Sequence, residues 1–145
     1  MSICSSTSRG MGKSMIKEAI LITGHGLSGD AHAGPGRRQV SLLAWEDVSA
    51  ANKKHGINAN SGDFAENIMT KGLDLKTIPV GRVLGMGGSA IRITEKGKPE
   101  HTSADYSFKG IALLAKKGLF AEVIESGHIH EGDEITVVNI GTGGC

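Results

Sequence analysis

The stretch at residues 24–34 packs four glycines, two histidines and one carboxylate into eleven positions. Glycine costs about 0.5–1 kcal/mol relative to alanine inside a regular element, so this composition predicts a loop rather than a strand or helix. Runs of β-prone residues precede and follow it, at residues 18–23 and 39–45. The loop is therefore expected to join two strands and to bring backbone N–H groups, Asp30 and His32 to one place.

A second stretch of similar character lies at residues 62–68, where acidic and amide side chains again stand beside a glycine. Phe64 and Ile68 are expected to anchor this stretch in the core. Glu66 lies in the same short apolar run, where an unpaired carboxylate would be costly. We expect the two glycine-containing stretches to face each other.

With 145 residues, the chain is long enough for one domain that buries roughly two-thirds of the surface of its unfolded form. We expect a single domain over residues 1–145, with flexible ends near residues 1–15 and 140–145. Aromatic residues make up only 3%, so the core must be built from aliphatic side chains. Turn signals recur about every 8 to 12 residues, a spacing typical of a small barrel or sandwich.

The formal net charge of +1 excludes a global field that would draw the protein to nucleic acid or to a membrane surface. Two cysteines at opposite ends of the chain, Cys4 and Cys145, do not form the framework of a disulfide-stapled secreted domain. No apolar run approaches the roughly 18 residues needed to span a bilayer. These features predict a cytoplasmic protein that binds neither nucleic acid nor membrane.

Periodicity and turn residues predict the remaining elements. A helix should begin at Glu46, bury Val48 and Ala51, and end at Gly56. A second helix is expected at residues 108–117, and strands at residues 2–4, 83–84, 90–94, 119–125 and 134–139. The link at residues 126–133, which holds two histidines, is expected to be a solvated loop. The Lys and Arg side chains of residues 1–15 are expected to be solvated as well.

The order of these segments resembles the MOSC domain, the module found at the C-terminus of molybdenum cofactor sulfurases and as small stand-alone proteins. The resemblance covers nearly the whole chain. It is carried by GLSGDAHAG at residues 26–34, RQVSLL at 38–43 and GDFAENI at 62–68, with shorter matches at residues 78–81, 93–94, 97–98, 118–121 and 132–135.

The resemblance implies a mostly β, barrel-like fold with a few short helices. It also implies a module that binds the molybdenum cofactor (molybdopterin) or carries sulfur, with a molybdoenzyme or a sulfur donor as partner. Pyridoxal phosphate binding is implied only at the level of the whole family. Members of the family present a cysteine in the loop that here spans residues 97–102, and this chain has Glu100 there. Neither Cys4 nor Cys145 matches that cysteine by position.

A phosphorylated pterin suits the two glycine-containing stretches. Backbone N–H groups of the first loop can bind phosphate, and Arg37 and Arg38 follow it with guanidinium groups that can grip phosphate in a bidentate way. Acidic and amide side chains can bind the donor-rich edge of a pterin. The expected cofactor-binding residues are Gly29, Asp30, His32, Arg38, Asp63, Glu66, Asn67 and Lys98. In an alternative interpretation, Asp30 and Asn67 only tie loop backbones together.

Three functions remain open at this stage. The first is a cofactor-binding and transfer module. The second is a cofactor-dependent reductase of small N-oxygenated or sulfur-containing compounds, in which His101 donates a proton and Glu100 replaces the thiol. The third is a degenerate scaffold for protein interaction. The chain contains no C-x-x-C or H-E-x-x-H pattern, so no metal ligands are predicted.

Overall fold

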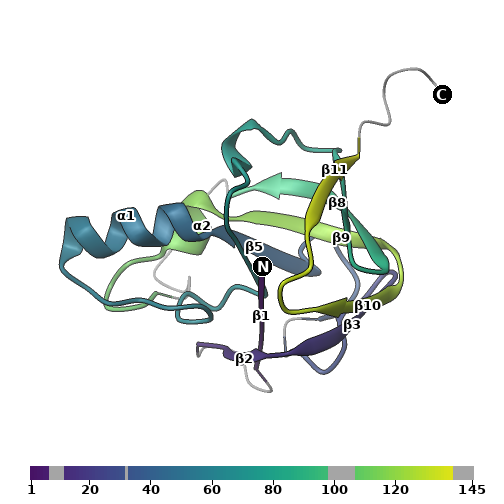
Figure 1. Ribbon diagram of the computed structural model, residues 1–145, viewed down its shortest axis with the longest axis horizontal. Helices are drawn as coiled ribbons and strands as arrows, with labels where there is room; N and C mark the ends of the chain where they lie inside the picture. Colours follow the sequence, from purple (N-terminus) through teal and green to yellow (C-terminus); the bar gives the residue numbers. More distant parts are fainter. Residues whose placement is uncertain (7–11, 32, 98–106, 139–145) are drawn as a thin grey trace.

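The computed structural model describes residues 1–6, 12–31, 33–97 and 107–138 of the chain (Figure 1). These residues form two sheets and two α-helices, α1 (Trp45–His55) and α2 (Leu113–Lys117), with a short 3₁₀ helix at Leu75–Thr77. The strands are β1 (Ser2–Ser5), β2 (Ser14–Ile16), β3 (Glu18–Ile22), β4 (Gly26–Leu27), β5 (Val40–Ala44), β6 (Ile68–Thr70), β7 (Val83–Met86), β8 (Ser89–Lys96), β9 (Leu119–Glu125), β10 (Gly127–His130) and β11 (Ile135–Val138).

The larger sheet has the strand order β11-β7-β8-β9-β5-β6-β1-β2, and the smaller one β10-β3-β4. All of the neighbouring strands are antiparallel except β5 and β6, which pair in parallel. The larger sheet curls into a half-barrel, while β3 and β10 run along the bottom of the view and the two helices lie together at the left (Figure 1). The prediction of a mostly β, barrel-like fold with a few short helices is confirmed.

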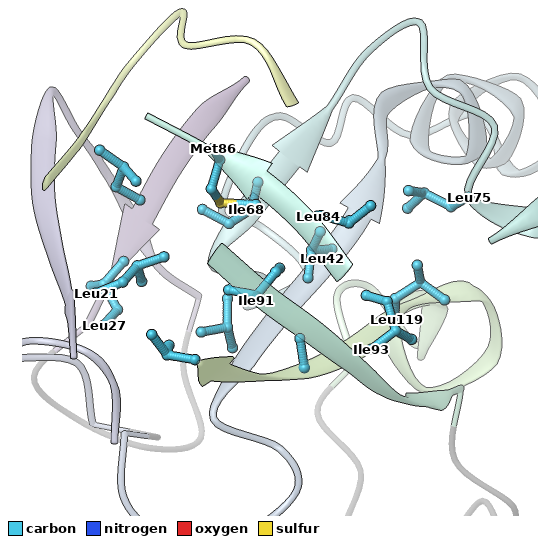
Figure 2. Packing of buried hydrophobic residues seen from close by; sticks show 14 of the residues in the cluster. Leu21, Leu27, Leu42, Ile68, Leu75, Leu84, Met86, Ile91, Ile93 and Leu119 are labelled. Atoms are coloured by element: carbon cyan, nitrogen blue, oxygen red, sulfur yellow. The ribbon is translucent and has the colours of Figure 1, made fainter. Parts of the chain in front are cut away.

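The main core lies between the two sheets (Figure 2). Leu21, Leu27 and Ile129 of the smaller sheet pack in one cluster with residues of the larger sheet such as Leu42 and Ile91, and all five side chains are fully buried. As the composition predicted, this core is aliphatic. Side chains at every second position of a strand face the same side of the sheet, so alternate residues of a strand can point into this core.

A second apolar cluster anchors the helices to the larger sheet. Val48 and Ala51 of α1 pack with Leu43 of β5 and with Phe64, which was predicted to lie in the core. Gly56 ends α1 with φ 63° and donates its N–H to Asn52 O, as a glycine in the left-handed region does at a helix end. Thus the first helix forms and ends as predicted.

Two predicted elements are wrong, and the loop predicted at residues 24–34 is interrupted by strand β4, which pairs with β3. The second helix begins only at Leu113, because Lys109 and Gly110 both adopt positive φ and form a turn between Phe108 and Ile111. The link at residues 126–133 is not a solvated loop, because Gly127–His130 forms strand β10 on β3. Ile129 is fully buried and anchors that strand in the core.

The Gly62 turn, residues 60–66, lies directly against the N-terminal segment. Gly62 has φ 89°, and a Cβ added there would lie 1.9 Å from the backbone O of Lys13. The Lys13 N–H also donates to Gly62 O at 2.8 Å. Only glycine permits so close an approach of the two backbones.

Replacing Gly62 with alanine should therefore destabilise the protein more than the same change at Gly72. Gly72 has a similar φ of 79°, but no atom lies within 4 Å of a Cβ added there. Gly72→Ala should cost about 1 kcal/mol for the strained backbone alone. Gly62→Ala should cost about 2 kcal/mol more, because Lys13 must move. Urea denaturation of both variants measures the difference, and equal losses would contradict the close approach.

Candidate functional site

The side chain of Lys13 is buried, and the prediction that it would be solvated is wrong. Its Nζ lies 2.6 Å from Asp30 Oδ1, and the side chains of Lys13 and Asp30 are only 1% and 0% exposed. An ammonium group can be buried when a carboxylate of opposite charge accepts its hydrogen bond. The sequence signal that could have found this pair is Asp30 itself, a lone carboxylate inside a glycine-rich loop.

Asp30 ties the glycine-rich loop to the N-terminal segment. Its Oδ1 accepts hydrogen bonds from Lys13 Nζ, from the Ser6 N–H at 3.1 Å and from Ser5 Oγ at 3.3 Å. Burial acts to raise the pKa of the Asp30 carboxyl, but the hydrogen bond and charge of Lys13, with the Ser6 N–H and Asn67, outweigh burial and lower that pKa. Asp30 is therefore a charged structural anchor of the loop.

Asn67 ties three backbone segments together. Its Oδ1 accepts from the Ser41 N–H at 3.1 Å, and its Nδ2 donates to Cys4 O at 3.3 Å. Its own N–H donates to Ser41 Oγ at 3.0 Å. These hydrogen bonds join β1 to β5, and Asn67 itself is only 1% exposed. These are the bonds expected from the interpretation in which Asn67 links loop backbones.

Glu66 is fully buried in the Gly62 turn. Its Oε2 accepts the Gly62 N–H at 2.7 Å, and its Oε1 has no hydrogen-bond partner within the described residues. Burial raises the pKa of Glu66 to about 7, and nearby Asp63 adds to the shift, although backbone N–H groups of the turn oppose it. The carboxyl group therefore keeps its proton between the ordinary pKa of 4.5 and about pH 7, where an exposed glutamate is already charged.

Cys4 lies beside these residues on β1. Its thiol is buried, and burial, with the charge of Glu66, raises the pKa of Cys4 to about 12. Since the thiolate is the nucleophile, this cysteine is inert at neutral pH. Together these residues form what we call the Lys13 cluster, which consists of Cys4, Lys13, Asp30, Gly62, Glu66 and Asn67.

The Lys13 cluster brings the two glycine-containing stretches together, but not across an open cleft. Lys13 donates its backbone N–H to Gly62 O and its ammonium group to Asp30. The two stretches were expected to face each other, and they lie close together with Lys13 and its neighbours between them. Asp63, in the same turn, accepts the Asn60 N–H at 2.8 Å and closes the turn.

Arg38 points away from the Lys13 cluster, toward β8 and β9. It holds Glu95 in a bidentate pair, with Nε and Nη2 each 2.9 Å from a carboxylate oxygen, and its guanidinium lies 5.4 Å from the centre of the Phe120 ring. Arg37 donates to Thr94 O at 2.9 Å. The Arg38 side chain is nevertheless 41% exposed, so a ligand can reach it from solvent.

Gly29 lies at the exposed tip of the glycine-rich loop with φ 83°, and no atom lies within 4 Å of a Cβ added there. Among the described residues, no acceptor bonds the N–H of Gly29 or of Gly36. The other expected site residues lie outside the described part of the chain, namely His32, Lys98, Glu100 and His101. Within the described ranges, no three His, Cys, Asp or Glu side chains are grouped to hold a metal.

A cavity of about 250 Å³ lies elsewhere, between the start of α1 and the chain after β6. None of the expected site residues lines it. Its wall includes Glu46, whose Oε2 accepts the Gly72 N–H at 2.8 Å. No helix in the residues that the structure describes has the length and apolarity needed to cross a membrane.

The MOSC domain model matches residues 28–136, so the chain belongs to the MOSC domain family. This family is associated with molybdenum cofactor binding. No curated protein matches the chain significantly.

Solved structures confirm the fold. The YuaD protein from Bacillus subtilis is similar with a TM-score of 0.74 and 18% identity, over 92% of this chain and 91% of that one. YiiM from Geobacillus stearothermophilus has a TM-score of 0.72 and 19% identity, over 98% and 75% of the two chains. YiiM from Escherichia coli has a TM-score of 0.69 and 21% identity, over 94% and 68%. At these identities the likeness shows the fold alone.

Removing the Lys13 ammonium should leave Asp30 as an uncompensated buried charge. Lys13→Met should therefore lower the free energy of unfolding at pH 7 by about 3–5 kcal/mol. The control is Lys17→Met, because Lys17 is exposed, and it should change stability by less than about 0.5 kcal/mol.

The pH dependence of the same variants separates charge from packing. The pair with Lys13 lowers the pKa of Asp30, so its contribution is present above the pKa of an unfolded aspartate and is lost as pH falls through the folded value. In Lys13→Met the carboxyl gains a proton more readily, so its deficit relative to wild type should shrink toward pH 3. A deficit that urea denaturation finds constant from pH 7 to pH 3 would contradict the charge assignment.

Proposed function

We propose that this chain binds the molybdenum cofactor (molybdopterin), with the cofactor's phosphate on the glycine-rich loop and the residues that directly follow it, up to Gly36. The observation that carries the proposal is the open backbone at Gly29 and Gly36. Both glycines are exposed, and no protein atom lies within 4 Å of a Cβ added at either position. Ligand atoms can therefore approach backbone N–H groups that a side chain would otherwise cover.

The phosphate end of the cofactor fits the residues present. Arg38 follows the loop and is partly exposed, and its pair with Glu95 fixes the plane of the guanidinium. A preorganised guanidinium binds a phosphate with less loss of side-chain entropy than a flexible one. His32 and Lys98 are proposed as further contacts to the cofactor.

The buried residues play a different part in this proposal. Asp30, Glu66 and Asn67 make their hydrogen bonds inside the protein, so they hold the loops in place rather than contacting the pterin in this conformation. Asp63 stabilises the same turn. A bound molybdenum cofactor would supply the redox chemistry of its metal, and the chain would bind and orient it.

Sulfur transfer by this chain is a weaker proposal than cofactor binding. Cys4 is buried and its thiol stays protonated at neutral pH, because burial raises its pKa to about 12. Glu100 lies in the stretch, residues 97–102, where the resemblance implies the family's cysteine, and no cysteine is present there. We therefore propose a role in holding or delivering the cofactor in the cytoplasm, to a molybdoenzyme as partner. The reductase role of Glu100 and His101 remains a prediction.

A protein-interaction scaffold is the second candidate. Ile20 and Ile22 of β3 are 41% and 38% exposed, and Met15 of the neighbouring β2 is 52% exposed. A contiguous patch formed by such side chains would be typical of a surface that contacts other proteins. Protein that never acquires molybdenum would favour this candidate.

The cofactor proposal is tested by expressing the chain in cells that make the cofactor. Purified wild-type protein should contain molybdenum by metal analysis and show cofactor absorbance. Arg38→Ala should reduce the bound cofactor about tenfold, which corresponds to the loss of one strong charge-assisted contact. The control is Arg92→Ala, because Arg92 forms a comparably exposed pair with Glu122 at 3.2 Å. Absence of molybdenum from wild type, or equal loss in both variants, would contradict the proposal.

A further inference from the structure

The carboxyl group of Glu66 is buried with fewer hydrogen bonds than a charged carboxylate requires. An ionised carboxylate can accept about four hydrogen bonds. Here Oε2 accepts the Gly62 N–H, whereas Oε1 is buried and has no hydrogen-bond partner among the described residues. The N–H groups of Phe64 and of Glu66 itself favour the charged form from nearby. This site is better suited to a neutral, protonated carboxyl group than to an anion.

The neighbouring charges do not compensate a negative charge on Glu66. Asp63, in the same turn, disfavours it. Lys13, from the segment packed against the turn, is held by Asp30 at 2.6 Å. The Cys4 thiol on β1 is neutral, because burial raises its pKa and the charges of Glu66, Asp63 and Glu131 add to the shift, while Lys13 opposes it. Ionising Glu66 would thus add a buried negative charge among groups that are already paired, neutral or negative.

The turn that holds Glu66 is also the contact to the N-terminal segment. The N–H of Gly62 binds the Glu66 carboxyl group, while the carbonyl of Gly62 accepts the N–H of Lys13 at 2.8 Å. The same carbonyl accepts the Ala65 N–H at 2.9 Å. Water can reach the carboxyl group only if this packing loosens. Hydration of an ionised Glu66 is therefore coupled to separation of the turn from Lys13.

We propose that the protonated carboxyl group of Glu66 keeps the Gly62 turn in contact with the chain around Lys13, and that loss of this proton opens the contact. We call this proton-dependent contact the latch. Between the ordinary pKa of a glutamate and about pH 7 the charged carboxylate is stabilised by water in the open form, so the open form gains population as the pH rises through this range. The latch belongs to the protein alone and does not depend on the proposed cofactor. The contact between the N-terminal segment and the Gly62 turn would therefore depend on pH.

Hydrogen exchange of the Lys13 and Gly62 amides, followed by NMR from pH 5 to pH 8, tests the latch. Burial raises the pKa of Glu66 to about 7, whereas a solvated glutamate in the open form titrates near its ordinary value. The population of the open form, after correction for the intrinsic exchange rate, should rise about tenfold per pH unit up to about pH 7 and then level off. In Glu66→Gln the same amides should show protection that does not change with pH.

The control is Asp63→Asn, which removes the other carboxylate of the turn and should keep the pH dependence with a slightly lower midpoint. A dependence that survives in Glu66→Gln, or is absent from wild type, overturns the proposal. The carboxyl ¹³C shift of Glu66 gives a second measurement on the unaltered protein. A titration midpoint near 7 supports the latch, and a midpoint below about 5 overturns it.

Discussion

The ion pair between Lys13 and Asp30 is the interaction on which the arrangement of the loops depends. At 2.6 Å, with both side chains almost completely buried, each charge requires the other. The pair fixes the glycine-rich loop to the N-terminal segment, and the backbone of Lys13 in turn receives the Gly62 turn. Three segments far apart in the sequence are thus held by a single lysine. The aliphatic core between the sheets provides the rigid support beneath them.

In this arrangement, the residues that hold the loops together differ from those that are open to a ligand. Acidic and amide residues that would suit a pterin ring are used inside the protein, where Asp30 and Asn67 bind backbone groups and Lys13. The surface open to a ligand consists instead of glycine backbone and the partly exposed Arg38. Binding of an anion by such a surface relies on preorganised N–H groups and one guanidinium rather than on net charge. That is consistent with a chain whose formal net charge is only +1.

Elements with strong local signals could be predicted from the sequence. The glycine-rich loop, the strand before it and the end of α1 at Gly56 all depend on residues adjacent in the chain. The start of α2 was missed at a local turn, whereas the other wrong predictions arose where distant residues decide the structure. Strand β10 pairs with β3 and passes close to Gly88, whose O would lie 2.0 Å from a Cβ added at Gly127. No pattern within residues 126–133 contains that contact.

In the candidate site, too, contacts between residues far apart in the sequence could not be predicted. The cost of an unpaired carboxylate drew attention to Glu66, whose cofactor-binding role stays a prediction and whose carboxyl group is buried with one oxygen unpaired among the described residues. The tying role of Asn67 was one of two interpretations. The burial of Lys13 was missed because its partner is 17 residues away, and the partner of Arg38, Glu95, is 57 residues away. Pairings over such distances depend on strand order, which no local pattern of polar residues specifies.

A double-mutant cycle between Lys13→Met and Asp30→Leu tests most directly whether one buried pair holds these segments together. Each single change leaves a buried charge without its partner, whereas the double change removes both charges. The account predicts that the double variant is more stable than the sum of the single losses implies, by at least about 2 kcal/mol in urea denaturation. A coupling within about 0.5 kcal/mol of zero would contradict it, because the two groups would then act independently.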